Sequence, residues 1–101
     1  MSDRASEELP ASSTRYRIAS KARLIFDNAR GKHMLMYPER GLELNVVAHA
    51  ILSLCDGRNT VDDIVALLTE RFSRTEPETV QRDVRAFLLQ LSQRGVLLGE
   101  E

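Results

Sequence analysis

The fold is decided by a short stretch near the middle of the chain, Pro38-Glu39-Arg40-Gly41-Leu42-Glu43-Leu44-Asn45. Within it, the run from Gly41 to Leu44 alternates in polarity, the period of two that is typical of a half-covered β-strand. Pro38 ends the strand before it, because proline has no amide hydrogen to donate to a strand ladder. Asn45 is a favoured helix N-cap, since its side-chain oxygen accepts a free amide of the first turn. The stretch therefore predicts a strand that leads directly into a helix.

Two more strands are expected before this stretch. From Ala22 to Asp27 apolar residues recur at every second position, and His33-Met34-Leu35-Met36-Tyr37 is another extended apolar run. Between them, Asp27-Asn28-Ala29-Arg30-Gly31 supplies residues that tolerate the left-handed backbone of a turn. The two runs predict a hairpin, and with the strand at 41–44 they make a three-stranded antiparallel sheet.

Three helices are expected after the sheet. The first runs over about 46–54 and is stopped by Asp56-Gly57, because glycine readily closes a helix end. The second starts at Thr60-Val61-Asp62-Asp63, a capping-box pattern. The third starts at Thr75-Glu76-Pro77-Glu78 and ends at Gly95, with a short closing segment at 96–98. The predicted fold class is α+β, with three strands followed by three helices.

A chain of 101 residues fits one domain. Residues 1–15 contain few large apolar groups and are expected to form a flexible N-terminal arm, with the folded domain at 16–101. The first residues contain neither a signal peptide nor an apolar stretch long enough for a membrane anchor, and a single cysteine cannot form an internal disulfide. We expect a cytoplasmic protein that does not bind membranes.

The side chains that carry chemistry are few and scattered. His33 and His49 lie far apart in sequence, with no partner at metal-ligand spacing. Cys55 falls at the end of an apolar helix stripe, where a free cysteine behaves as a small hydrophobe. The pair Asp62-Asp63 is explained by helix capping. We therefore expect no catalytic residues, no metal site and no cofactor, so that an enzyme is the least supported class of function.

Binding functions fit the composition better. A winged-helix regulator that reads DNA is one alternative, because its strand and helix content is similar. The net charge of -1 and the few cations of the last helix, Arg82, Arg85 and Arg94, argue against nucleic-acid binding. An open strand edge is also suited to a second copy of the chain, so a homodimer stays an open alternative.

From Arg23 to Leu98 the sequence resembles the PqqD family of pyrroloquinoline quinone (PQQ) biosynthesis, a branch of the peptide-recognition elements of ribosomal peptide maturation. The segments that carry the resemblance are Arg23-Leu24-Ile25-Phe26-Asp27, Leu35-Met36-Tyr37-Pro38-Glu39-Arg40-Gly41-Leu42-Glu43-Leu44-Asn45, Ile51-Leu52-Ser53-Leu54-Cys55-Asp56-Gly57, Thr60-Val61-Asp62-Asp63-Ile64 and Asp83-Val84-Arg85-Ala86-Phe87-Leu88. One departure is His33-Met34, where members of the family often have tryptophan.

The resemblance implies a winged-helix-like fold and a peptide chaperone. Such a protein would bind the precursor peptide PqqA and present it to the radical S-adenosylmethionine (SAM) enzyme PqqE, without doing chemistry itself. It also implies that the peptide adds as a strand beside the third strand and lies against the third helix. The peptide-binding residues implied in this sequence are Gly41, Leu42, Glu43, Leu44, Arg82, Arg85 and Leu89.

The physical chemistry of these residues agrees with that implied role. An exposed strand edge offers unpaired backbone groups, which an extended peptide can satisfy. Alternation turns Leu42 and Leu44 toward the core and leaves Glu43 facing a partner. Leu89 lies outside the main apolar stripe of its helix, so it is a candidate wall for an apolar peptide side chain or else a flanking core residue.

Overall fold

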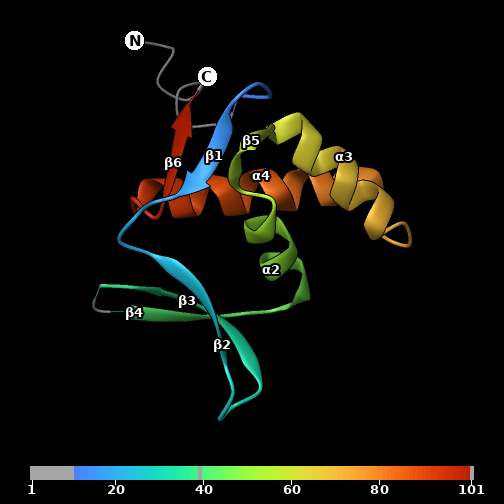
Figure 1. Cartoon of the computed structure of the whole chain (residues 1–101). Coiled ribbons are helices and arrows are strands. Elements are labelled where there is room, and N and C mark those ends of the chain that lie inside the picture. Colours follow the sequence, from blue (N-terminus) through green and yellow to red (C-terminus); the bar gives the residue numbers. More distant parts are fainter. Residues whose placement is uncertain (1–10, 39, 101) are drawn as a thin grey trace.

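The computed structural model describes residues 11–38 and 40–100. Over these two ranges the chain forms two three-stranded antiparallel sheets and three helices, which confirms the α+β class (Figure 1). The predicted sheet lies at one end of the molecule and a second sheet at the other, with the first helix between them and the second helix to the side of the second sheet (Figure 1). No helix within the described ranges is both long and apolar enough to span a bilayer.

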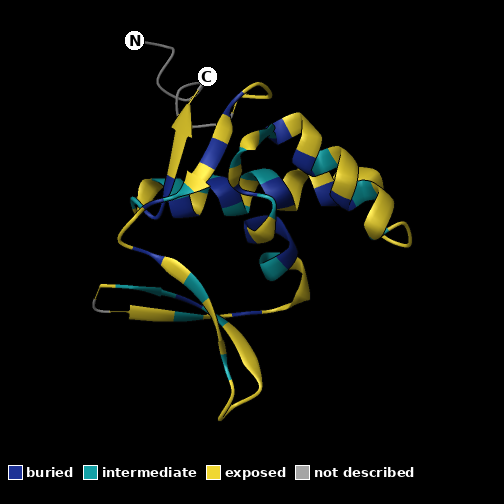
Figure 2. Cartoon of the chain, in the orientation of Figure 1, coloured by how far each residue is buried: buried dark blue, intermediate teal, exposed yellow. Residues whose placement is uncertain are grey.

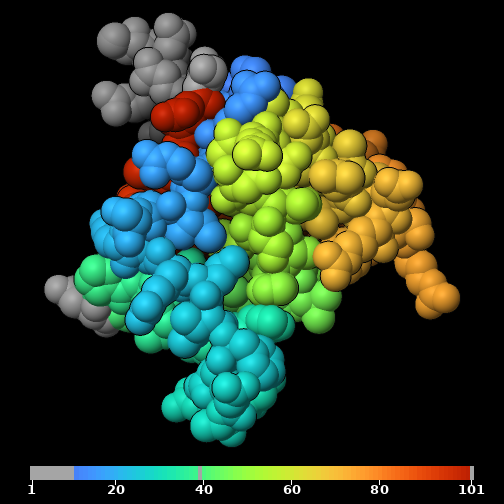
Figure 3. All heavy atoms as spheres, in the orientation of Figure 1, coloured from blue at the N-terminus to red at the C-terminus, as the bar shows by residue number. Residues whose placement is uncertain are grey.

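The predicted sheet consists of β2 (Arg23–Asp27), β3 (Lys32–Tyr37) and β4 (Arg40–Leu44), in the order β2-β3-β4. Its register pairs Leu24 with Leu35 and Leu35 with Leu42, so these three leucines share the inner face. Leu35 is fully buried there. The turn between β2 and β3 is exposed and projects from the body of the molecule (Figures 2 and 3).

The second sheet was not predicted. It has the order β5-β1-β6, formed by β1 (Arg15–Ile18), β5 (Asp56–Thr60) and β6 (Leu97–Glu100). The expectation of a single sheet was therefore incomplete. Residues 97–98 of the predicted closing segment belong to β6, and residue 15 of the predicted arm begins β1. The arm prediction at residues 1–10 lies outside the described residues.

The three helices begin where the sequence signals place them. They are α2 (Val46–Ser53), α3 (Val61–Arg71) and α4 (Pro77–Gln93). The Asn45 side chain accepts the Ala48 amide at 2.8 Å. The capping box of α3 is complete, because Asp63 donates its amide to the Thr60 hydroxyl at 3.0 Å and its carboxylate accepts the Thr60 amide at 2.9 Å. At the end of α4, Gly95 adopts a φ of 75°, a left-handed conformation that glycine adopts without steric penalty.

One hydrophobic core joins the helices to both sheets (Figure 2). On α4 the buried positions are Val80, Val84, Leu88 and Leu91, which recur at helical spacing and fix how the helix is rotated about its axis. This rotation decides which of the remaining α4 side chains face β4, and therefore which can belong to a site there.

Candidate peptide-binding groove

The outer edge of β4 is open. In the described part of the chain β4 pairs only with β3, so one row of its backbone amides and carbonyls has no strand partner. Such an edge can accept an extended segment of another polypeptide. The feature that the sequence placed at residues 41–44 is thus present as an edge strand.

A groove lies beside this edge, between β4 and one flank of α4. It has a volume of about 230 Å³, and the start of α2 contributes Asn45 and Ala48 to it. Its lining residues are Leu42, Glu43, Leu44, Asn45, Ala48, Phe87, Gln90, Leu91 and Arg94. The lining combines apolar side chains with the Arg94 cation at the C-terminal end of α4 and the Glu43 carboxylate, which is already paired with Lys32. Such a lining suits an extended peptide that carries apolar and acidic residues.

The groove continues along α4 toward the helix N-terminus. A second hollow of about 300 Å³ shares Asn45, Ala48 and Phe87 with the first. Its remaining lining residues are Val47, Ile51 and Asp83. The two hollows adjoin, because these three residues border both, and we describe them together as the β4–α4 groove.

The predicted β4 residues divide between the two faces of the strand. Leu42 and Leu44 are half-buried and buried, as alternation predicts, while Glu43 is exposed and forms an ion pair with Lys32 at 2.8 Å. Gly41 lies on the outer face, where an added Cβ would meet the Met36 sulfur at 3.0 Å. A larger residue at Gly41 would push this methionine aside.

The predicted α4 residues lie elsewhere on the helix. Arg82, Arg85 and Leu89 share one flank, roughly 140° around the axis from the flank that lines the groove, given about 100° per residue. Arg82 pairs with Asp83 at 3.6 Å. Arg85 donates to the Ser12 hydroxyl at 2.9 Å and lies 3.5 Å from the Asp62 carboxylate, so it contacts the segment before β1 and the start of α3. The structure does not bring these three residues to β4.

The α4 residues that do face β4 were not predicted as a site. Phe87 was assigned to the core stripe, Arg94 was considered only with Arg82 and Arg85 as a cation of the last helix, and Gln90 was given no role. The signal that was present is their spacing, since Asp83, Phe87, Gln90 and Arg94 recur every three or four residues and so lie on one flank.

The two histidines, far apart in sequence, meet at the junction between the sheet and α2. The His33 and His49 rings stack with centroids 3.8 Å apart, and Phe26 packs edge-on against His33 at 4.9 Å. Burial lowers the pKa of His49 from its usual 6.5, and the nearby His33 and Arg71 add to that effect. This contact ties β3 to the helix from which the groove residue Ala48 projects.

We expect acidification to weaken the fold through His49. Its folded pKa lies below the unfolded value of 6.5, so the unfolded chain binds the proton more tightly and stability falls as the pH drops below 6.5. Urea unfolding at about pH 7.5 and about pH 5.5 should show a smaller loss for His49→Gln than for the unchanged protein. Equal losses in the two proteins would contradict this assignment.

Cys55 is positioned for packing. It is buried and its thiol donates to the Ile51 carbonyl at 3.4 Å, while burial raises the pKa of the thiol to about 12. The thiolate needed for nucleophilic or metal-binding chemistry is therefore scarce near neutral pH. Over residues 11–38 and 40–100, no three histidine, cysteine or acidic side chains are grouped so that they could hold a metal ion.

Several known proteins that are similar to this chain are named for a part in PQQ synthesis. A bifunctional coenzyme PQQ synthesis protein C/D of Methylorubrum extorquens is 40% identical over 81 residues, which cover 80% of this chain and 22% of that protein. The PqqA binding protein of Klebsiella pneumoniae is 46% identical over 65% of this chain and 70% of its own length. The PqqA binding protein of Rhizobium meliloti is 36% identical over 80% of this chain and 82% of its own length.

A solved structure has the same fold. The solution structure of the PqqD part of Methylobacterium extorquens PqqCD, described as a functional stand-alone recognition element for ribosomally synthesized and post-translationally modified peptides, aligns with a TM-score of 0.66 and 38% identity. The alignment covers 82% of this chain and 87% of the solved chain. Residues 32–97, which include β4, α2 and α4, match the model of the family of coenzyme PQQ synthesis protein D. With sequence and fold in agreement, this chain belongs to the PqqD family.

Proposed function

We propose that this protein is a peptide chaperone of PQQ biosynthesis, which binds the precursor peptide PqqA along the β4–α4 groove and presents it to the radical SAM enzyme PqqE. The observation that carries the proposal is the open edge of β4 beside a groove that is lined in part by apolar side chains. The peptide would add a fourth strand to the β2-β3-β4 sheet, while its side chains on one face would enter the groove.

Two kinds of observation support a peptide as the ligand. The backbone edge can hold any extended chain, and the side chains of Leu42, Phe87 and Leu91 supply an apolar surface that selects among sequences. Relatives at 46% and 36% identity are named PqqA binding proteins, and the solved relative is described as a peptide recognition element. We transfer that ligand class to this chain as a proposal.

Arg94 would set the charge preference of the groove. It lines the groove together with Leu42 and Glu43, where it can pair with a carboxylate of the peptide. An exposed pair of this kind contributes about 0.2 to 1 kcal/mol, so it tunes affinity and association rate more than it holds the peptide. Backbone pairing with β4 and apolar contacts with Phe87 would carry most of the affinity.

We further propose that the chain acts by binding rather than by catalysis, and that it works in the cytoplasm with the enzyme that modifies the peptide. The high pKa of the Cys55 thiol supports a structural role for that residue. The fusion of C and D parts in the Methylorubrum relative supports operation beside other PQQ-synthesis proteins. PqqE is the partner that the presenting role requires.

Calorimetry with a synthetic PqqA peptide tests the binding step. We expect saturable heat with one peptide per chain, and no saturable heat with a scrambled peptide of the same composition. A second assay compares PqqE-dependent modification of PqqA with and without this protein. Absence of binding would overturn the proposal, while binding without any effect on PqqE would overturn only the presenting role.

A further inference from the structure

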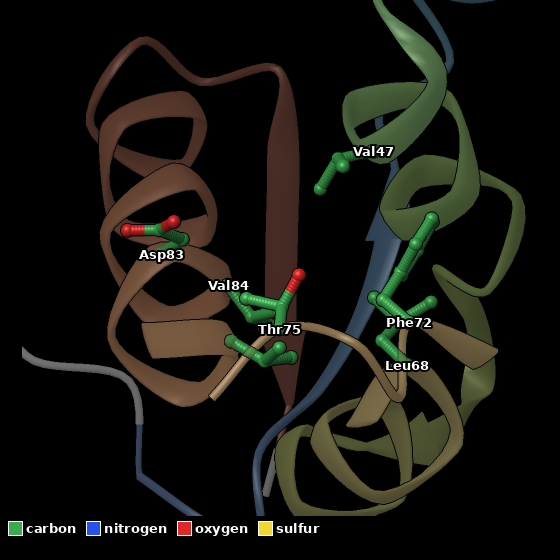
Figure 4. A pocket seen from close by; sticks show the side chains of 7 residues that line it. Val47, Leu68, Phe72, Thr75, Asp83 and Val84 are labelled. Atoms are coloured by element: carbon green, nitrogen blue, oxygen red, sulfur yellow. The ribbon is translucent and has the colours of Figure 1, made fainter. Parts of the chain in front are cut away.

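A third hollow lies beyond the proposed peptide groove, where α2, α3 and α4 converge (Figure 4). It has a volume of about 130 Å³. Val47 of α2 and Leu68 of α3 line it, together with Phe72, which directly follows α3 (Figure 4). On the other side lie Asp83 and Val84 of α4, and Thr75 comes from the loop between α3 and α4 (Figure 4). Val80 completes the lining.

This hollow, which we call the helix-junction pocket, neighbours the peptide groove. Val47 and Asp83 line both the pocket and the 300 Å³ hollow, which in turn shares Asn45, Ala48 and Phe87 with the groove beside β4. A chain that lies in the groove and runs past the end of β4 therefore comes close to the pocket at Val47 and Asp83.

The chemistry of the pocket selects an apolar group. Leu68 and Val84 are each 1% exposed and line it with methyl groups, whereas Val47 is 40% exposed at its border. The polar lining residues are Thr75 and Asp83, and the Asp83 carboxylate already pairs with Arg82 at 3.6 Å. Apolar cavities of about 150 Å³ accept a molecule as large as benzene, so this one fits an aliphatic side chain.

The spacing between groove and pocket also fits one peptide. Leu91 borders β4 and Val84 borders the pocket, seven residues apart on α4, which is about 10 Å along the axis. An extended chain advances about 3.3 Å per residue, so about three peptide residues span this separation. Strand pairing at β4 and occupation of the pocket are thus compatible within a single short segment.

We propose that the helix-junction pocket is a second anchoring site of the peptide groove, which takes an aliphatic side chain about three residues beyond the segment paired with β4. This inference rests on the proposed function, because the occupant is a residue of the same precursor peptide. It adds a sequence requirement to the ligand: two apolar contacts at a fixed separation, one beside Leu91 and one in the pocket.

Val47→Lys tests the pocket, with Val46→Lys as the matched control. Both residues lie in the first turn of α2, so the added charge interacts with the same end of the helix dipole in both variants. Val46, however, is 66% exposed and is not among the residues that line the three hollows. We expect Val47→Lys to weaken binding of a synthetic PqqA peptide about tenfold or more, as loss of a buried aliphatic contact does. Val46→Lys should bind like the unchanged protein.

Methyl NMR on the unchanged protein gives an independent readout. Addition of the peptide should shift the methyl signals of Leu68, Val80 and Val84 together with the amide signals of β4, and alanine at one aliphatic peptide residue should remove only the pocket shifts. Peptide binding that shifts β4 but leaves the pocket methyls and the Val47→Lys affinity unchanged would overturn the pocket and leave the proposed function standing. Absence of all shifts would overturn both.

Discussion

Ala48→Arg is expected to reduce the affinity for the precursor peptide by at least about 30-fold, the loss typical of a binding hot spot. Ala48 borders both hollows of the groove and is half-buried. A long side chain at this position would therefore occupy the groove and exclude the peptide. Arginine has a helix propensity close to that of alanine, and α2 should therefore still form. Calorimetric titration of the variant measures the effect.

Val46→Arg is the control for this variant. It places the same side chain two residues earlier, at a position that is 66% exposed and away from the groove. Its peptide affinity should match that of the unchanged protein. If Ala48→Arg also bound the peptide normally while remaining folded, the β4–α4 groove would not be the binding site.

Leu35→Ala should cost about 2 to 5 kcal/mol of folding free energy, the usual range for a fully buried leucine. Leu35 is 0% exposed in the central strand of the β2-β3-β4 sheet, opposite Leu24 and Leu42. Its removal would leave a cavity between the sheet and the core and loosen the strand that holds β4 in place. Urea unfolding monitored by circular dichroism measures the loss.

Ile25→Ala gives the comparison on the same sheet. Ile25 is 38% exposed and pairs with Met34, so it lies on the face opposite Leu35. Its truncation removes a similar number of methyl groups but little buried surface, and the loss of stability should be clearly smaller. Equal losses from the two variants would show that the inner face of this sheet is not packed as described.

The sequence predicted local features well, because their signals lie within a few residues of each other. Asn45 caps α2 through the Ala48 amide, and Thr60 with Asp63 forms the capping box of α3. The alternation of residues 41–44 gave both the strand and the inward direction of Leu42 and Leu44. These features depend on backbone geometry that a short segment specifies by itself.

The second sheet depended on contacts that no local pattern reveals. Asp56–Thr60 has a composition typical of a turn, and Asp56 accepts the amides of Arg58 and Asn59 at 2.8 and 3.1 Å. It becomes β5 because it pairs with β1, some 40 residues earlier in the chain. The β1–β6 pairing joins residues even farther apart. Short strands of this kind are stabilised by their partners more than by their own sequence.

The position of the site also depends on contacts that no local sequence pattern reveals. Periodicity located the strand β4 but not whether its edge is open, and the flank of α4 that faces this strand depends on how Val84, Leu88 and Leu91 pack against the core. The family resemblance implied Arg82, Arg85 and Leu89, and the structure places Phe87, Gln90 and Arg94 beside β4. A role for the first set therefore requires a peptide that also reaches the opposite flank, where Arg85 already contacts Ser12 and Asp62.

Isotope-filtered NMR of the complex with PqqA tests most directly whether the peptide binds along the edge of β4 and the facing flank of α4. It detects contacts between unlabelled peptide protons and the labelled protein, so it reports both strand pairing and the helix flank. We predict cross-strand contacts between peptide backbone protons and residues 40–44, together with contacts from peptide side chains to Phe87 and Leu91. Peptide contacts confined to Arg82, Arg85 and Leu89, with none at β4, would contradict the account.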